Sequence, residues 1–104
     1  MLLFKKKFLP AIRAGEKTQT IRLWKHRRMR AGQRSYVPGV GHIVVETVER
    51  VALADLTDED ARRDGFATAG ELQLELAHLY AAELAAGRQA YRVRFRLAPR
   101  ETAG

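Results

Sequence analysis

The segment from Ala90 to Leu97 alternates apolar and polar side chains without a break, and this pattern constrains the fold more than any other part of the chain. Successive residues of a strand point to opposite faces of a sheet, so the apolar and the charged side chains separate. The alternation therefore predicts a strand that gives one face to a hydrophobic core. The inward set is Tyr91, Val93, Phe95 and Leu97, and the outward set is Arg92, Arg94 and Arg96.

The rest of the chain predicts a mixture of strands and helices. Strands are expected at 2–5, 18–23, 33–37 and 42–53, and helices at 8–14, from Thr57 to the region of Gly65, and at 68–84. The last helix carries an apolar stripe that is expected to be core: Leu72, Leu76, Leu79, Tyr80 and Leu84. The 104 residues suit one α+β domain over 1–104, with a tail that is expected to fray from about Ala98.

A polar cluster marks the junction between the first helix and the strand at 18–23. The run Gly15 to Arg22 contains a lysine, two threonine hydroxyls and an arginine. Thr18, Thr20 and Arg22 should share one face of the strand, while Ile21 and Leu23 face a core. Lys17, in the turn, can lean over the polar face. This pattern fits a compact site that grips a ligand, and it also fits an ordinary edge strand with a solvated polar face.

The helix that starts after Thr57 ends on a carboxylate. Thr57 and Asp60 form a capping box, and Gly65 suits the left-handed position after the last turn. Asp64 then lies at a helix C-terminus, where the helix dipole disfavours a negative charge by roughly 0.3–1 kcal/mol. A residue placed against a local preference points to a function. The alternative is an aspartate at a helix end that is simply exposed to water.

The segment after the strand at 18–23 is a basic loop with one large aromatic residue at its start. A base can stack on an indole while arginines contact phosphates, so this loop fits a site for single-stranded nucleic acid. The alternative is that the indole belongs to the core and the cations are solvated. The candidate ligand-binding residues in this loop are Trp24, Lys25, Arg27, Arg28 and Arg30.

The net charge of +7 is distributed unevenly. Residues 1–34 carry +10, residues 35–85 carry −7 and residues 86–104 carry +4. If the two terminal segments pair in one sheet, their cations could form one patch, which is the usual footprint of a protein that meets phosphates. A basic face that only keeps the protein in solution fits the same count.

Several classes of site have no support in the sequence. The chain has no cysteine, so it can have no disulfide partner and no thiolate zinc site. Its histidines, His26, His42 and His78, lack metal-ligand spacing, and neither a metal nor a cofactor is expected. Met1 to Phe4 is too short an apolar stretch for a signal peptide, and no stretch approaches the ~20 apolar residues of a membrane span. The expected location is cytoplasmic.

Taken in order, these motifs resemble the ASCH domain, a relative of the PUA domain, over residues 2–97. The resemblance rests on Gly15-x-Lys17-x-x-Thr20-x-Arg22, Leu56-Thr57-x-x-x-Ala61 followed by Asp64-Gly65-Phe66, the Glu71-Leu72 helix, the Leu79-Tyr80 pair and Phe95. It implies a small PUA-like β-barrel flanked by two to three helices, with a cleft beside the first motif. It also implies RNA or a modified nucleoside as the partner.

A compact bacterial branch of that family resembles amidohydrolases that remove the acetyl group from N4-acetylcytidine. The resemblance assigns their catalytic set to Lys17, Thr20 and Asp64, with the threonine as nucleophile and the lysine as its base. This chain has aspartate at position 64, where that branch has glutamate, and a displacement of about 1 Å can cost on the order of a hundredfold in rate. RNA or nucleoside binding and amide hydrolysis both remain open at this point. A nuclease has little support in the sequence, because the chain shows neither a cluster of metal-binding carboxylates nor paired histidines.

Overall fold

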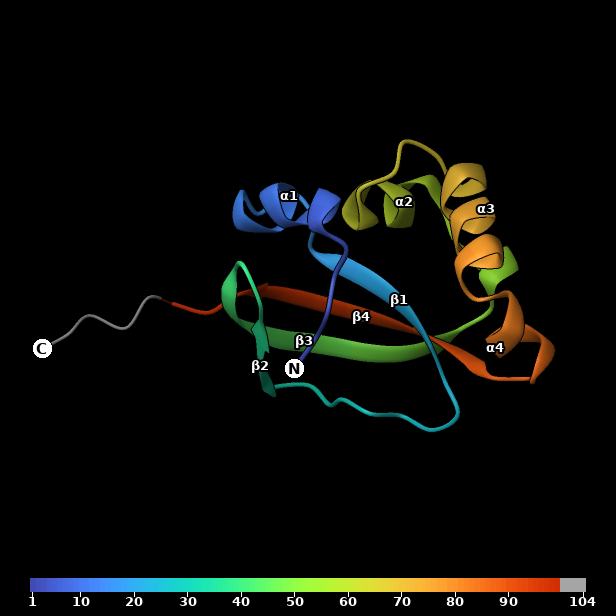
Figure 1. The fold of residues 1–104 in the computed structure, drawn as a ribbon, viewed down its shortest axis with the longest axis horizontal. Helices are drawn as coiled ribbons and strands as arrows, with labels where there is room; N and C mark the ends of the chain where they lie inside the picture. Colours follow the sequence, from blue (N-terminus) through green and yellow to red (C-terminus); the bar gives the residue numbers. More distant parts are fainter. Residues whose placement is uncertain (100–104) are drawn as a thin grey trace, which may run out of the picture.

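Four strands form one antiparallel sheet in the order β1-β4-β3-β2, and helices α1, α2 and α3 lie beyond its β1 edge (Figure 1). The computed structural model describes residues 1–99. The elements are η1 (Lys6–Phe8), α1 (Leu9–Arg13), β1 (Gln19–Trp24), β2 (Arg34–Val37), β3 (Gly41–Val51), η2 (Leu53–Asp55), α2 (Asp58–Asp64), α3 (Ala69–Leu79), α4 (Ala81–Ala85) and β4 (Gln89–Leu97).

Strand β4, the alternating segment, lies between β1 and β3. Its predicted inward residues Tyr91, Val93 and Phe95 are buried, which confirms the alternation, whereas Leu97 at the end of the strand is 40% exposed. Because β1 pairs with β4, the N-terminal and C-terminal segments lie side by side in the sheet. Strand β1 is left with one unpaired edge, and that edge is where polar residues gather.

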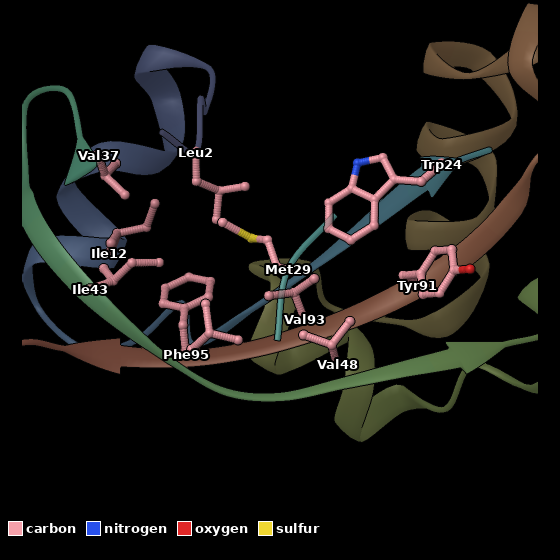
Figure 2. Packing of buried hydrophobic residues seen from close by; sticks show 11 residues of the cluster. Leu2, Ile12, Trp24, Met29, Val37, Ile43, Val48, Tyr91, Val93 and Phe95 are labelled. Atoms are coloured by element: carbon pink, nitrogen blue, oxygen red, sulfur yellow. The ribbon is translucent and has the colours of Figure 1, made fainter. Parts of the chain in front are cut away.

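The two faces of the sheet bury different apolar clusters. One face carries a cluster to which β3, β4, α1 and the loop after β1 contribute (Figure 2): Leu2, Ile12, Trp24, Met29, Val37, Ile43, Val45, Val48, Tyr91, Val93 and Phe95. The other face packs under α2 and α3 through Ile21, Leu23, Leu56, Ala61, Leu72, Leu76 and Ala90. Strand β1 is therefore buried on both faces, with Ile21 and Leu23 facing a core as the alternation predicts.

The long strand β3 is interrupted by an irregularity in its pairing with β4. The register shifts between Val45 and Thr47, so one extra residue is accommodated there. A bulge of this kind bends a strand and increases its twist. Strand β3 pairs with β2 before the bulge and with β4 on both sides of it, and the sheet curls into a half-barrel.

The predicted strand at 2–5 is wrong. Only the backbone N–H of Leu2 reaches a strand, donating to the carbonyl of Tyr36 at 3.0 Å. The carbonyl of Leu3 instead accepts from the Arg22 side chain at 2.6 Å. Because the Arg22 side chain occupies the carbonyl of Leu3, the segment at 2–5 forms no ladder of backbone hydrogen bonds with a strand.

The predicted helix over 68–84 is divided at Tyr80, whose backbone (φ −114°, ψ 27°) leaves the helical region. Leu72 and Leu76 are buried as expected, but Leu79 is 45% exposed and is not a core residue. The tail predicted to fray from Ala98 falls mainly on residues 100–104, which lie outside the described residues. Ala98 itself is held by a 3.0 Å hydrogen bond to the carbonyl of His42.

The helix before Asp64 has the predicted ends. Thr57 and Asp60 form a reciprocal capping box, and Gly65 adopts φ +98° at the other end. No helix within residues 1–99 is long and apolar enough to cross a membrane.

Candidate functional site

A small pocket lies along the free edge of β1, where four parts of the chain converge. Its cavity volume is about 100 Å³. The walls come from the N-terminal segment, from β1 and the turn before it, from the end of α2 and from α3: Leu3, Phe4, Lys5, Phe8, Lys17, Thr20, Ile21, Arg22, Asp64, Phe66, Leu72, Glu75, Leu76, Leu79 and Tyr80. All three predicted catalytic residues, Lys17, Thr20 and Asp64, are among them.

Lys17 is held in this pocket by the turn between α1 and β1. Gly15 takes φ +75° and closes the helix, and the backbone N–H of Lys17 donates to the carbonyl of Ala11. Thr18 then bonds through its N–H to the carbonyl of Arg63, which ties the turn to α2. The Lys17 side chain is only 2% exposed, so its ammonium group must find partners inside the protein.

Asp64 is the principal partner of Lys17. The Nζ atom of Lys17 donates to Oδ1 of Asp64 at 2.6 Å and also to the backbone carbonyl of Asp64. The same Nζ lies 4.6 Å from the centroid of the Phe8 ring. The second carboxylate oxygen of Asp64, Oδ2, is buried without a hydrogen-bond partner within residues 1–99. Asp64 therefore has one buried oxygen whose hydrogen bonding is not satisfied by this part of the chain.

Gly65 ends α2 beside this pair. Its φ of +98° is one that side chains rarely adopt. A Cβ at position 65 would make only ordinary van der Waals contact with the Phe8 ring at 3.6 Å and with Cδ of Lys17 at 3.8 Å. The backbone conformation that turns the chain after Asp64, rather than the space around it, therefore favours glycine at this position.

Burial shifts the pKa of Lys17 and the pKa of Asp64 in the directions that favour the neutral form of each side chain. It lowers the pKa of Lys17 from its ordinary value of 10.5, although the Asp64 carboxylate opposes the change. It raises the pKa of Asp64, against the opposing effect of the Lys17 ammonium. Opposite shifts of a paired acid and base in a cleft are a common property of functional sites.

Thr20 and Arg22, which share one face of β1, provide the other polar groups of the pocket. Thr20 is 6% exposed, and its Oγ1 accepts from Nε of Arg22 at 3.2 Å. Because that bond uses Thr20 as an acceptor, its own hydroxyl proton remains free to be donated. Arg22 also donates through Nη2 to the carbonyl of Leu3, and its guanidinium carbon lies 4.9 Å from the Phe4 ring centroid.

Aromatic rings form much of the remaining wall, and the sequence patterns did not assign them to the site. Phe8 and Phe66 approach to 5.8 Å between ring centroids, and Phe4 and Tyr80 also line the cavity. Phe66 and Tyr80 are the last residues of the Asp64-Gly65-Phe66 and Leu79-Tyr80 motifs, whereas Phe4 and Phe8 belong to neither. Their convergence depends on contacts between distant segments, which a local pattern cannot reveal.

No protein-family model matches the sequence, and no curated protein matches it. The ASCH domain from Lactobacillus crispatus JV V101 has a similar structure, with a TM-score of 0.72 at 15% identity over 85% of this chain and 68% of that one. This chain has an ASCH fold. Protein EF3133 from Enterococcus faecalis V583 gives a TM-score of 0.74 at 18% identity, covering 88% of this chain and 67% of that one. Hypothetical protein PH0355 gives a TM-score of 0.75 at 16% identity, covering 90% of this chain and 94% of that one.

These matches confirm the predicted α+β, PUA-like fold. The ASCH fold here is a curled half-barrel of four antiparallel strands with helices packed against it. At identities of 15–18% the likeness concerns the fold alone. The function of the pocket has to be argued from its own residues.

Of the seven predicted ligand-binding residues, Arg22 lines the pocket, and Thr18, Trp24 and the four cations of the basic loop lie apart from it. The side chain of Thr18 does not line it. Trp24 is 9% exposed and packs in the sheet cluster, with its ring centroid 5.4 Å from that of Tyr91 (Figure 2). Most of the indole surface is therefore covered by the core. The structure favours the core interpretation of Trp24 over the stacking one.

The basic loop is exposed and lies outside the pocket. Lys25, Arg27, Arg28 and Arg30 are all on the surface, and Met29 between them is buried. The cations of β4 do not join this loop in one patch. Arg92 pairs with Asp60 at 3.2 Å, and Arg94 lies 3.7 Å from the same carboxylate, on the helix side of the sheet. The residues 1–99 contain no group of three or more side chains able to hold a metal ion.

Proposed function

We propose that this protein binds a nucleobase in the pocket beside β1, presented by RNA or by a modified nucleoside. The observation that supports this most directly is that Asp64, whose buried Oδ2 has no hydrogen-bond partner within residues 1–99, lines a cavity walled by aromatic rings. Binding sites typically combine apolar walls with a few convergent polar groups, often with shifted pKa values.

The size of the cavity limits what can enter. A volume of about 100 Å³ is below the roughly 300–1,000 Å³ of pockets that enclose a whole drug-sized ligand. A flat ring can enter such a space while the remainder of the ligand stays outside. The Phe8 and Phe66 rings offer apolar surfaces of the kind on which bases stack.

The polar groups in the pocket favour a base with an exocyclic amino group. A carboxylate accepts well from the N4 amino group of cytosine, whereas uracil presents a carbonyl oxygen at that position. The carboxylate and that oxygen would repel each other. The free proton of Thr20 could be donated to a ring nitrogen or carbonyl of the same base. Cytidine should therefore bind more tightly than uridine.

Calorimetric titration of cytidine and uridine into the protein tests this proposal. We expect cytidine to bind at least about fivefold more tightly, the lower end of the discrimination given by a matched base edge. Asp64→Asn keeps an oxygen for Lys17 and turns an amide donor toward the ligand, so the preference should disappear or reverse. Equal affinity for the two nucleosides in the wild type, or no binding of either, would overturn the proposal.

A second candidate function is hydrolysis of an N4-acylated cytidine, and the contact between Lys17 and Asp64 favours it. Thr20 would attack the acyl carbon as its proton passes to a neutral Lys17, and the bond to N4 would break as that nitrogen gains a proton. Water would then release the acyl group from Thr20. Burial favours the neutral lysine that this step needs. No hydrogen bond joins Lys17 and Thr20 within residues 1–99, so the step requires the lysine to shift toward the threonine.

Incubation with N4-acetylcytidine, followed by chromatography of the nucleoside, tests this second function. Thr20→Val should abolish release of acetate, because it removes the nucleophile at nearly constant volume. Thr18→Val is a matched control, since Thr18 lies two residues away and does not line the pocket. Arg28→Ala should also retain turnover. Full activity in Thr20→Val would exclude the mechanism, and absence of turnover in the wild type would leave the pocket as a binding site.

A further inference from the structure

An ion pair joins two walls of the pocket beside β1. Nζ of Lys5, in the N-terminal segment, lies 3.3 Å from Oε1 of Glu75 on α3, and both residues line the pocket. Nζ of Lys7 approaches the same oxygen at 3.9 Å. Lys5 and Glu75 are 70 residues apart in the sequence. This rim pair, Lys5 and Glu75, therefore connects the N-terminal segment to α3 across the pocket.

The rim pair lies on the solvent side of the pocket, and the buried pair of the candidate site lies at its floor. The side chains of Lys5 and Glu75 are 51% and 27% exposed. The side chains of Lys17 and Asp64 are only 2% and 7% exposed, although they line the same pocket. A ligand that comes from solvent to Lys17 and Asp64 therefore has to pass the rim.

We propose that the rim pair is a gate, which keeps the pocket closed while Lys5 and Glu75 are paired and admits a ligand when they separate. This inference rests on the proposed function, because it takes the pocket as the place where the ligand binds. It adds a control of access, exerted by two side chains that the candidate site does not include.

The size of the cavity supports a closed form. With the rim pair formed, the cavity volume is about 100 Å³, which suits a flat ring but not a whole nucleoside. When a base occupies the floor of the pocket, its ribose has to lie at the rim, where the side chains of Lys5 and Glu75 meet. Binding and the rim pair therefore compete for the same space.

The structure allows the gate to open without unfolding. The N-terminal segment runs beside β1 to η1 and α1 (Figure 1), and it is anchored before Lys5, where Leu2 is buried in the sheet cluster and Phe4 packs against it. Opening then needs only a change in the two side chains of the rim pair. Exposed ion pairs add little stability and are screened by salt, so the closed form should exceed the open form by no more than about fivefold.

Labelling of Lys17 with cyanate tests the gate without any nucleoside. The neutral amine of the lysine adds to isocyanic acid and forms a urea with no leaving group, and peptide mass spectrometry measures the product. Early in the reaction, the rate at Lys17 is divided by the rate at the exposed Lys25 of the same molecule. Glu75→Gln removes the charge that holds the rim pair, so this ratio should rise about two- to fivefold. High salt should raise the ratio in the wild type and not in Glu75→Gln.

Glu59→Gln is the matched control for the labelling. It makes the same chemical change and breaks another exposed ion pair, with Arg63, but Glu59 does not line the pocket. The Lys17 ratio should therefore stay at the wild-type value in Glu59→Gln.

Titration of cytidine at several salt concentrations is the second measurement. Cytidine carries no net charge, so a salt dependence of its affinity reports on ion pairs of the protein. The wild type should bind cytidine more tightly as salt rises, because screening weakens the rim pair. Glu75→Gln should bind it about two- to fivefold more tightly than the wild type at low salt, and its affinity should change little with salt.

The two measurements separate a failure of the gate from a failure of the proposed function. If Glu75→Gln leaves the labelling of Lys17 unchanged, or if Glu59→Gln raises it equally, the gate is overturned whether or not cytidine binds. Weaker binding of cytidine by Glu75→Gln would mean that Glu75 contacts the ligand, and it would also overturn the gate. If the labelling responds as expected but no nucleoside binds, the gate is supported and the proposed function fails.

Discussion

Lys17 and Asp64, which are 47 residues apart in the sequence, meet in a buried ion pair with 2.6 Å between Nζ and Oδ1. The pair joins the turn before β1 to the last residue of α2. A buried pair of this kind contributes little net stability as a pair, but removal of one partner leaves an uncompensated charge. Lys17 and Asp64 therefore fix the geometry of the pocket, and their removal should show a strong coupling.

Lys17→Met should lower the free energy of unfolding by about 3–5 kcal/mol, and the double variant Lys17→Met with Asp64→Leu should recover much of the loss. Chemical denaturation of the wild type, the two single variants and the double variant measures both effects. The exposed pair Arg63–Glu59 serves as the control, since Glu59→Gln should change the stability little. Additive losses in the double variant would mean that the two side chains do not act as a pair.

The lowered pKa of Lys17 gives a pH dependence with a definite sign. The folded protein releases the lysine proton at a lower pH than the unfolded chain, whose lysine titrates near 10.5. Over the window below 10.5 the unfolded state binds more protons, so the stability of the wild type should rise with pH relative to Lys17→Met. The difference in free energy of unfolding, measured by denaturation at several alkaline pH values, tests this. A difference that stays constant below 10.5 and falls above it would mean that Asp64 raises the pKa of Lys17 and that the lysine is a poor base.

Two glycines of the α2–α3 region should respond to alanine in opposite directions. Gly65→Ala should destabilise the protein by about 1 kcal/mol or more, because position 65 has φ +98°, which disfavours any residue with a Cβ. Gly70→Ala, inside α3 with only the Thr68 hydroxyl at 3.9 Å, should stabilise it by about 0.4–1 kcal/mol. Thermal denaturation compares the two. Equal effects would contradict the left-handed backbone at position 65.

Trp24 provides a test of the core against the surface interpretation. Trp24→Ala should lower the free energy of unfolding by about 3–5 kcal/mol, since the indole is buried beside Tyr91. Tyr36→Ala is the control, because Tyr36 is 46% exposed on β2 and should cost far less. Similar losses for the two variants would indicate that Trp24 is accessible and available for stacking.

Local patterns predicted most of the elements because their signals are local. The alternation in β4, the capping box of Thr57 and Asp60 and the left-handed Gly65 each depend on neighbouring residues and are confirmed. The segment at 2–5 was misjudged because the Arg22 side chain takes the carbonyl of Leu3, a contact that no pattern along the chain reports.

Part of the candidate site could also be predicted from the sequence. The mismatch of Asp64 with the helix dipole singled it out, and the structure brings it to Lys17 beside Thr20. The choice between core and surface for Trp24 could not be made from the sequence, because both interpretations put an aromatic residue at a strand end. It was decided by packing against Tyr91, 67 positions away along the printed sequence.

Titration of cytidine into isotope-labelled protein, followed through the backbone amide resonances, tests the central claim most directly. If the pocket beside β1 binds the base, the largest shifts should fall on residues 15–22 and 64–66, which carry Lys17, Thr20 and Asp64, while the amides of β2 change little. Shifts confined to β2 or to the loop at 25–30, or no shifts at all, would contradict the account.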